Sequence, residues 1–483
     1  MIDYKPKTKQ YKHQEFITEK TKEMQSYGLL MEQGTGKTKV IIDTFGHLFL
    51  KGEINSVFVV APNGVHRNWI NEEIPKHLPS DIEYESMFWE NGKSKTKTFQ
   101  AKFLEMINSD KLCILTTNIE SFRVPHACFN FLTFCKRRNV MMIVDESARI
   151  KNPKAQQTKN VIKLGRFCPY KRILTGTPVT NSPFDLYSQF EFLNPSIIDH
   201  NSFYSFKNYF GIFEKKTNWG SSRQYDELKS YRNLEELKSL IKPHSYRITK
   251  DECLDLPEKI YTKRYFKMTK KQQDAYLKIK EDFVIMIESE PEIPLPMALT
   301  RMMKLQQVSS NFVMLEENNS RTIDDKNNPR LETLLEIIND TPEDESLIVW
   351  CRFTYDIDII TNKLNELKIS NCRYDGKTDS NERSISLKKF QDKEYKVFVA
   401  NPATAAEGLN LFVANNVVYY SNSFKLGDRQ QSEDRAHRIG QDKNVLYYDL
   451  VAENTLDYKI IKVLIEKQEL ANIITGDNIK EWL

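Results

Sequence analysis

The chain has 483 residues, of which 40% are hydrophobic and 11% are aromatic. A chain of this length exceeds what one hydrophobic core usually supports, so we expect two compact domains and little disorder. Lys and Arg number 70 against 66 Asp and Glu, and the resulting net charge of +4 is too small to indicate a nucleic-acid-binding protein by itself.

Cysteine spacing and hydropathy argue against two classes of protein. The seven cysteines form no CxxC pair and have no histidine at zinc-finger spacing, so we expect reduced thiols and no zinc. The N-terminal MIDYKPKTKQ lacks an apolar signal segment, and no run of about 18 apolar residues occurs. We therefore expect a protein that is not secreted and does not bind membranes. The Lys- and Asn-rich, Gly-poor composition would suit an AT-rich viral or bacterial genome, so we expect a protein in the cytoplasm of a bacterium or of a virus-infected host cell.

Short apolar, β-branched runs alternate with longer helical patterns along the first half of the chain. They occupy residues 56–62, 112–117, 140–146 and 172–178. The pattern restarts at residues 346–351, 372–376, 396–401, 417–421 and 445–450. Continuous apolar runs of this length suit parallel strands that are covered on both faces. The sequence therefore predicts an α/β protein with two parallel sheets.

The segment between the two sets of strands, residues 201–328, shows few strand signals. We predict a helical insertion at about 201–245, a helix over 269–290, and a linker. Pro257 interrupts the pattern after Leu256, which places the domain boundary there. The predicted domains are residues 1–256 and 257–483, and the core of the second domain lies at about 330–483.

The segment MEQGTGKT, residues 31–38, lies between the apolar GLL and KVII, where a strand would turn into a helix. Gly34 and Gly36 would let backbone N–H groups approach phosphates, Lys37 would place its charge on the β- and γ-phosphates, and Thr38 would offer a hydroxyl to Mg²⁺. The alternative is a simple glycine turn before a helix, because the strict phosphate-loop pattern has glycine where Met31 stands.

A pair of acidic residues ends the apolar run VMMIVDE, at Asp145 and Glu146. Asp145 could hold Mg²⁺ through its waters, and Glu146 could orient or deprotonate the attacking water. A solvated pair at the end of a strand is the alternative, and the phosphate loop earlier in the chain makes it less favoured.

The segment QQSEDRAHRIGQ, residues 430–441, carries two arginines three residues apart. Arg435 and Arg438 would share one face of a helix and could neutralise charge that develops on a γ-phosphate. Taken in isolation, the segment favours a different interpretation, in which Glu433 and Asp434 form salt bridges on a surface helix.

These motifs occur in the order seen in helicase superfamily 2, and QSEDRAHRIGQ resembles the Snf2 family in particular. Gln14 in YKHQ looks like the adenine-reading glutamine of that family. Further segments that resemble family motifs are residues 61–69, 116–122, 246–259, 347–354, 374–390 and 401–411. The chain departs from the common pattern at Gln33 and Thr35, where members often carry Met and Leu. We expect this departure to be harmless to ATP binding.

The resemblance implies two RecA-like lobes with helical insertions and an ATP site in the cleft between the lobes. The residues implied for ATP binding are Gln14, Gly34, Thr35, Gly36, Lys37 and Thr38. Thr38 and Asp145 are the implied Mg²⁺ ligands. Sequence-independent contacts to DNA are expected from Arg67, Thr117, Asn118, Arg352, Asn401 and Thr404, for which loop capping is the alternative role.

The resemblance also implies an ATP-dependent DNA translocase that is compact and stands alone. Its task could be movement on duplex or branched DNA, including branch migration, 3′ to 5′ strand separation, or removal of DNA-bound proteins. An inactive DNA-binding scaffold is a distant alternative, because it would need none of the expected catalytic residues. The aromatic segment 203–219 is the one place where we expect a strand-separating pin, although a packed helical insertion is favoured there. The sequence names no protein partner.

Overall fold

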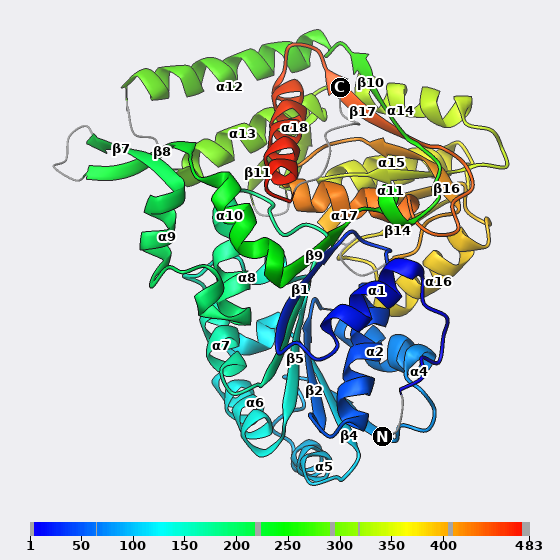
Figure 1. Ribbon diagram of the computed structural model, residues 1–483. Helices are drawn as coiled ribbons and strands as arrows, with labels where there is room; N and C mark the ends of the chain where they lie inside the picture. The colour runs from blue at the N-terminus through cyan, green and yellow to red at the C-terminus, as the bar shows by residue number, and fades with distance from the viewer. Residues whose placement is uncertain are drawn as a thin grey trace. The chain divides into compact units, whose positions relative to one another are not determined.

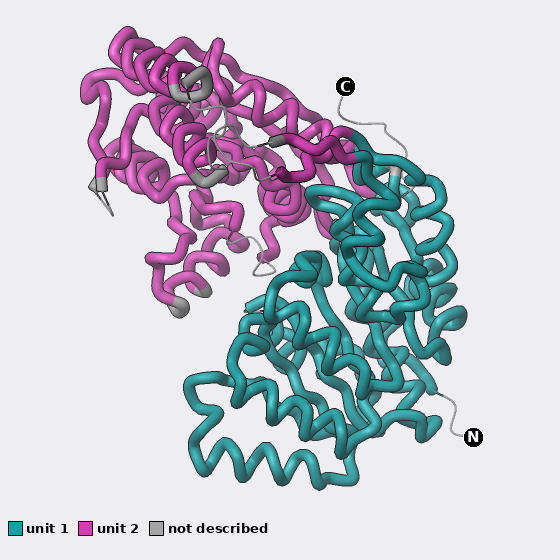
Figure 2. Tube along the Cα trace, turned by 90° about the vertical axis from the view of Figure 1, so that its left-hand side faces the viewer, with its two compact units in different colours: residues 1–212, 230–255, 470–478 teal, residues 213–229, 256–469, 479–483 magenta. Residues whose placement is uncertain are grey.

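The computed structural model describes residues 4–63, 65–217, 224–289, 295–316, 319–403 and 409–475. The chain divides into two compact units, which Figure 2 colours separately. Unit 1 consists of residues 1–212, 230–255 and 470–478, and unit 2 of residues 213–229, 256–469 and 479–483. None of the helices in these described ranges is long and apolar enough to cross a bilayer.

Unit 1 is built on a seven-stranded sheet whose recorded pairings are all parallel. In spatial order the strands are β3 (Tyr84–Phe88), β4 (Leu112–Asn118), β2 (Ser56–Ala61), β5 (Val140–Asp145), β6 (Tyr170–Leu174), β1 (Ser26–Met31) and β9 (Ser245–Ile248). Helices lie on both faces of this sheet (Figure 1). On one side are α1 (Lys12–Thr21), α2 (Lys37–Leu50) and α4 (Ile74–His77), and on the other α6 (Pro125–Arg137), α7 (Gln156–Gly165) and α8 (Leu186–Leu193).

Strand β2 shows why these runs are apolar throughout. Phe58 and Val60 enter one apolar core, whereas Val57 and Val59 enter the core on the opposite face. Successive side chains of a strand point to opposite faces, so a sheet covered on both sides needs an apolar residue at every position. The predicted strands of the first half are therefore all present.

Unit 2 contains a six-stranded parallel sheet of the same kind. In spatial order its strands are β10 (Lys259–Phe266), β17 (Val445–Ala452), β16 (Ala414–Tyr419), β13 (Ser346–Trp350), β15 (Val397–Ala400) and β14 (Asn371–Tyr374). Its helices include α14 (Pro329–Asp340), α15 (Thr354–Glu366), α16 (Ser380–Gln391), α17 (Leu426–Ala436) and residues 456–469 of α18 (Leu456–Thr475). The predicted fold class, two parallel-sheet α/β lobes, is confirmed.

The segment that joins the sheets contains strands that we did not predict. The expected helical insertion at 201–245 holds α9 (Phe203–Phe210) and α10 (Leu234–Ile241), but β7 (Gly211–Thr217) and β8 (Gln224–Tyr231) form a two-stranded sheet between them. An all-helical insertion is therefore wrong. Most side chains of β8 are exposed, so this strand lacks the alternation of apolar and polar residues that identifies a strand.

Two long helices follow in unit 2, α12 (Lys270–Ser289) and α13 (Leu295–Ser309). A small antiparallel pair, β11 (Phe312–Glu316) and β12 (Asn319–Thr322), comes after them. The units divide between residues 255 and 256, beside the expected break at Pro257. Residues 470–478 belong to unit 1, although we had expected the whole of 257–483 to form the second domain.

Candidate nucleotide site and nucleic-acid contacts

The predicted phosphate loop connects β1 to α2, because β1 ends at Met31 and α2 begins at Lys37. Gly34 and Gly36 have φ of 83° and 88°, in the left-handed region that favours glycine. A Cβ at Gly36 would lie 2.1 Å from Nε2 of Gln14, so a side chain there would displace Gln14 as well as strain the backbone. Lys37 Nζ donates to the carbonyl oxygens of Met31 and Glu32, at 2.9 and 3.1 Å.

Gln14 of α1 lies against this loop, as the resemblance implies. Its Nε2 donates to the carbonyl oxygen of Thr35 at 3.0 Å, and its Oε1 accepts from the backbone N–H of Tyr11 at 3.0 Å. A primary amide carries a second N–H and a second lone pair, so Gln14 can hold the loop and still read the edge of a base.

Asp145 stands at the end of β5 and is fixed by an indole. Trp69, which directly follows α3 (Val65–Asn68), donates its Nε1–H to Oδ2 of Asp145 at 3.0 Å. Burial, and then the neighbouring carboxylate of Glu146, raise the pKa of Asp145 to about 6. The sequence analysis placed Trp69 only at the end of a segment, residues 61–69, that resembles a family motif. The signal it missed is that a buried indole N–H usually finds an acceptor.

Glu146 adopts a strained backbone, with φ of 50° and ψ of 55°. Non-glycine residues in this region cost free energy and cluster at functional sites. Gln33 of the phosphate loop donates its Nε2–H to Oε1 of Glu146 at 2.9 Å. The other carboxylate oxygen, Oε2, is buried and accepts no hydrogen bond from the residues that the structure describes. The sequence analysis did not predict this contact. Gln33 departs from the family pattern, and the contact shows that its side chain is part of the candidate site.

These groups fit a nucleoside triphosphate with a divalent cation. The loop supplies the glycine backbone and Lys37 for the phosphates, and Asp145 is a buried carboxylate that a cation would stabilise in its charged form. Thr38 lies in the first turn of α2, next to Lys37. Unit 1 thus brings together every predicted nucleotide residue of the first half of the chain.

The arginines of the second half are arranged differently from the prediction. Helix α17 ends at Ala436, and His437, with φ of −86° and ψ of 86°, leads the chain out of the helix. The ring of His437 is hydrogen-bonded to the carbonyl oxygen of Pro257 at 2.8 Å. Arg435 is therefore on the helix and Arg438 lies beyond its end, so the prediction that they share a helix face is wrong.

The alternative of a salt-bridged surface helix is also wrong. Glu433 and Asp434 are both buried. Glu433 accepts from Arg429 at 2.6 Å and from the hydroxyl of Tyr261 at 2.9 Å. Beyond the helix, Arg438 donates to the carbonyl oxygen of Leu409 at 3.2 Å.

The candidate DNA contacts of unit 1 differ in exposure. The guanidinium of Arg67 is half exposed, pairs with Glu90 at 3.0 Å, and lies 4.9 Å from the ring centre of Phe88. Thr117 is fully buried in β4. The side-chain oxygen of Asn118 accepts the backbone N–H of the residue three positions later, at 3.0 Å. Asn118 thus has the capping role that was the alternative, and contact of these residues with DNA stays a prediction.

In unit 2, Arg352 and Asn401 lie together. Arg352 lies two residues after the end of β13 and Asn401 directly follows β15, and both line a cavity of about 450 Å³ to which α13 also contributes. Asn401 Nδ2 donates to the carbonyl oxygen of Arg352 at 2.9 Å, and the guanidinium of Arg352 donates to Oε1 of Gln306. Ligands of parallel α/β sheets bind at the carboxyl ends of the strands. Thr404 lies outside the described residues.

Comparison with known proteins identifies the family. The SNF2-related domain matches residues 10–314, and the helicase conserved C-terminal domain matches residues 329–440. The chain therefore belongs to the SNF2-related family. It is 28% identical over 445 residues to an uncharacterised ATP-dependent helicase of Mycoplasma genitalium, covering 91% of this chain and 39% of that protein.

A second relative is the ATP-dependent helicase fft1 of Schizosaccharomyces pombe, with 25% identity over 495 residues, 93% of this chain and 51% of that protein. The chain thus spans about two fifths to one half of the length of these relatives. A similar solved structure is the Sulfolobus solfataricus SWI2/SNF2 ATPase core in complex with double-stranded DNA. Its TM-score is 0.42 at 26% identity, covering 99% of this chain and 95% of that one.

Proposed function

We propose that this chain is a Snf2-type motor that hydrolyses ATP to move on duplex or branched DNA inside the cell. The observation that carries the proposal is the convergence in unit 1 of the phosphate loop, Gln14, Asp145 and Glu146, with Gln33 bonded to Glu146. An inactive scaffold would have no need for a strained acidic residue beside a phosphate loop.

In this proposal the adenine of ATP is read by Gln14, and the phosphates are bound by backbone N–H groups of residues 34–38 and by Lys37. Thr38 and Asp145 would hold Mg²⁺, which would supply positive charge next to the phosphates. Because Oε1 of Glu146 already accepts from Gln33 and the buried Oε2 accepts no hydrogen bond among the described residues, we assign to Oε2 the orientation of the attacking water and the acceptance of its proton. Arg435 and Arg438 stabilise the charge that develops on the γ-phosphate during transfer, as arginine fingers do.

DNA contact in this proposal is made through phosphates and is independent of base sequence. Its support is the neighbourhood of Arg352 and Asn401 at the carboxyl ends of β13 and β15, and the half-exposed guanidinium of Arg67. Relatives that share the family are named ATP-dependent helicases, which agrees with a nucleic acid as the track.

Strand separation is the second candidate. The observation that favours it is the pair β7 and β8, which begins within the aromatic segment 203–219 where we expected a pin. Most side chains of β8 are exposed, and the cross-strand ion pairs Lys216–Glu227 and Lys229–Glu214 join the two strands. A two-stranded ribbon of this kind buries little surface of its own.

The test compares ATP hydrolysis without nucleic acid and with single-stranded, duplex, forked, four-way and RNA cofactors, using Lys37→Ala as the inactive control. We expect duplex or branched DNA to stimulate turnover most, and the control to show none. If none of these cofactors stimulates ATP hydrolysis, the proposal of a nucleic-acid motor is refuted. Stimulation accompanied by unwinding of a long plain duplex, without junction movement, would favour the second candidate.

A further inference from the structure

The guanidinium of Arg352 is held in place by α13. Its Nη1 donates to Oε1 of Gln306, and the side chain is mostly buried. The backbone is fixed as well, because the N–H of Arg352 donates to the hydroxyl of Ser421 at 2.8 Å and its carbonyl oxygen accepts from Asn401 at 2.9 Å. The direction of this guanidinium therefore depends on Gln306.

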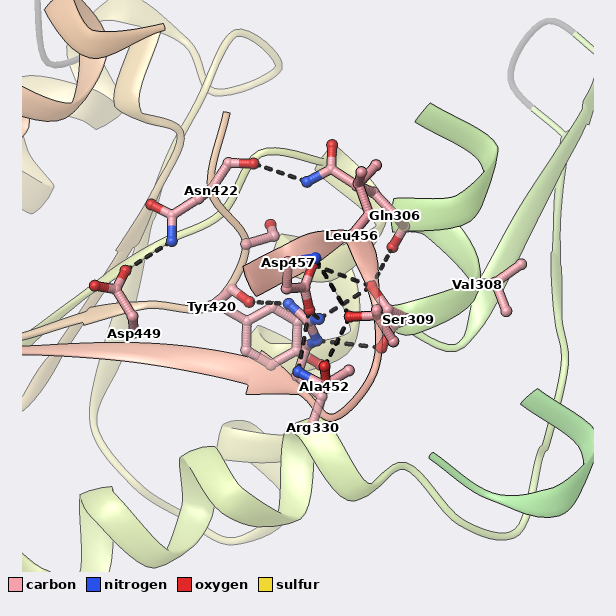
Figure 3. A network of polar contacts seen from close by, with 12 residues as sticks. Gln306, Val308, Ser309, Arg330, Tyr420, Asn422, Asp449, Ala452, Leu456 and Asp457 are labelled. Carbon is pink, nitrogen blue, oxygen red and sulfur yellow. Dashed lines mark hydrogen bonds and ion pairs between the residues drawn. The ribbon is translucent and has the colours of Figure 1, made fainter. Parts of the chain in front are cut away.

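Gln306 has a second partner on its other end. Its Nε2 donates to the carbonyl oxygen of Asn422 at 3.0 Å, a contact visible in Figure 3. The orientation of the amide is fixed by chemistry, because a guanidinium offers no acceptor and a carbonyl oxygen offers no donor. Gln306 is buried, so neither of these hydrogen bonds can be replaced readily by water.

From Asn422 the hydrogen bonds continue into α17. Asn422 Nδ2 donates to Oδ1 of Asp449 at 2.7 Å, and Arg429 donates to Oδ1 of Asn422 at 2.9 Å and to Oδ1 of Asp449 at 2.6 Å. Arg429 also donates to Glu433 at 2.6 Å. These residues are all buried or half-buried, and Arg429 and Glu433 lie on the helix that carries Arg435.

The backbone of Gln306 is held by Ser309, one turn later on the same helix. Ser309, three residues later on α13, donates its hydroxyl to the carbonyl oxygen of Gln306 at 2.9 Å. The same serine receives two hydrogen bonds from Arg330, which is itself paired with Asp457 (Figure 3). Because its backbone is held in this way, Gln306 cannot follow Arg352 if the guanidinium turns toward another acceptor.

We propose that Gln306 is a positioning residue that couples DNA engagement at Arg352 to the α17 helix, and so to the rate of ATP hydrolysis. This inference rests on the proposed function, in which Arg352 contacts a DNA phosphate and Arg435 acts on ATP. A phosphate competes with Gln306 for the guanidinium donors, since charged pairs of this kind make the stronger hydrogen bonds. Once Arg352 releases Oε1, the amide of Gln306 turns, which weakens its bond to the carbonyl oxygen of Asn422 and shifts the network that holds Arg429 and Glu433.

Two variants separate the parts of this network. Gln306→Met keeps the length of the side chain and removes both hydrogen bonds. Gln306→Glu keeps an acceptor for Arg352 and replaces the donor to Asn422 with a second acceptor. The matched control is Gln307→Met, since Gln307 is about as buried on the same helix, and the one hydrogen bond of its side chain among the described residues is accepted from the backbone N–H of Met314, at 3.1 Å.

The readout is the ratio of kcat with saturating duplex DNA to kcat without DNA, together with the DNA concentration that gives half of the stimulation. Coupling energies between sites correspond to changes of about 5- to 150-fold. We expect the ratio to fall at least about fivefold in both Gln306 variants and to be unchanged in Gln307→Met. Gln306→Glu should raise the half-stimulating DNA concentration, because its carboxylate forms a charged pair with Arg352 against which a phosphate must compete.

Further outcomes decide between explanations. If DNA does not stimulate ATP hydrolysis by the unmodified chain, the proposed function fails. If DNA stimulates both Gln306 variants as much as the unmodified chain, the proposed function stands and only the coupling through Gln306 is refuted. A loss of the same size in Gln307→Met would mean that packing of α13 is responsible, and would also refute it. If Gln306→Met does not fold, Gln306→Glu alone decides. In an Arg352→Ala background, adding Gln306→Glu should lower the ratio no further, and an additive loss would contradict the proposal.

Discussion

Replacement of Arg330 by Met should destabilise unit 2 strongly. Arg330 is 1% exposed, and its guanidinium donates to Asp457, to the carbonyl oxygen of Tyr420, and to both the carbonyl oxygen and the hydroxyl of Ser309. It also lies 5.0 Å from the ring centre of Phe266. Met would retain much of the apolar contact and remove every one of these donors, so the variant isolates the polar part of the interaction.

The expected loss of stability comes from the buried groups that Arg330→Met leaves without a partner. Removal of one partner of a buried ion pair costs about 3 to 5 kcal/mol, because the remaining charge is buried and uncompensated. The unsatisfied carbonyl oxygens of Ser309 and Tyr420 add at most about 1 to 3 kcal/mol each. We therefore expect the free energy of opening of unit 2 to fall by at least about 3 to 5 kcal/mol. The control Lys363→Met breaks an exposed pair with Glu366 and should cost at most about 1 kcal/mol.

Hydrogen exchange measured by mass spectrometry on the amides of β13 and β16 gives this free energy for unit 2 by itself, which a whole-chain melting curve does not. The second replacement Asp457→Leu, made together with Arg330→Met, should recover part of the loss because it removes the stranded charge. A loss below about 1 kcal/mol in Arg330→Met, similar to that of the exposed control, would refute the reasoning.

Other predictions concern the nucleotide site and pH. Lys37→Ala and Glu146→Gln should each lower the rate of DNA-stimulated ATP hydrolysis by a factor of about 10² to 10⁴. Glu146→Gln should still bind a fluorescent ATP analogue. Undiminished turnover in Glu146→Gln would show that Glu146 is not the general base. Arg435→Ala should lower kcat by about 10³ or more with DNA affinity retained, and lost affinity at normal basal kcat would reassign it to DNA binding. Burial raises the pKa of Asp356 from 3.8 to about 7, so the folded state keeps a proton that the unfolded chain releases. The contribution of Asp356 to stability is therefore full below about pH 4 and is lost as pH rises to 7. In urea titrations the free energy of unfolding of the unmodified chain should fall over this pH range relative to that of Asp356→Asn. The same pH dependence in both proteins would contradict the raised pKa of Asp356.

The sheets could be predicted because their strands are buried on both faces. Strands such as β2 and β13 consist almost wholly of apolar residues, because a strand that is covered on both faces needs apolar side chains on each, and such a run can be recognised from the local sequence alone. The phosphate loop and the acidic residues after β5 could be predicted for a similar reason, since each is a short local pattern next to a strand.

Elements and contacts that depend on distant parts of the chain could not be predicted. Strands β8 and β10 are rich in polar residues and show no clear alternation, because β8 belongs to a ribbon and β10 lies at the edge of its sheet. The end of α17 is set by a hydrogen bond between His437 and a residue 180 positions earlier.

The same holds within the candidate site. The contact of Gln33 with Glu146 spans 113 residues, and that of Trp69 with Asp145 spans 76. Spacing along the chain indicates which residue types are present and gives no information on such partners. These are the contacts that engage one oxygen of Glu146 and hold Asp145 in place.

The central claim, that ATP hydrolysis drives movement along duplex DNA, is tested most directly by displacement of a third strand from a DNA triplex. The duplex is extended on one side of the triplex so that the protein loads at a distance. We predict that the unmodified chain displaces the third strand only with ATP, and that Lys37→Ala and Glu146→Gln displace none. DNA-stimulated hydrolysis without displacement, or displacement without ATP, would contradict the claim.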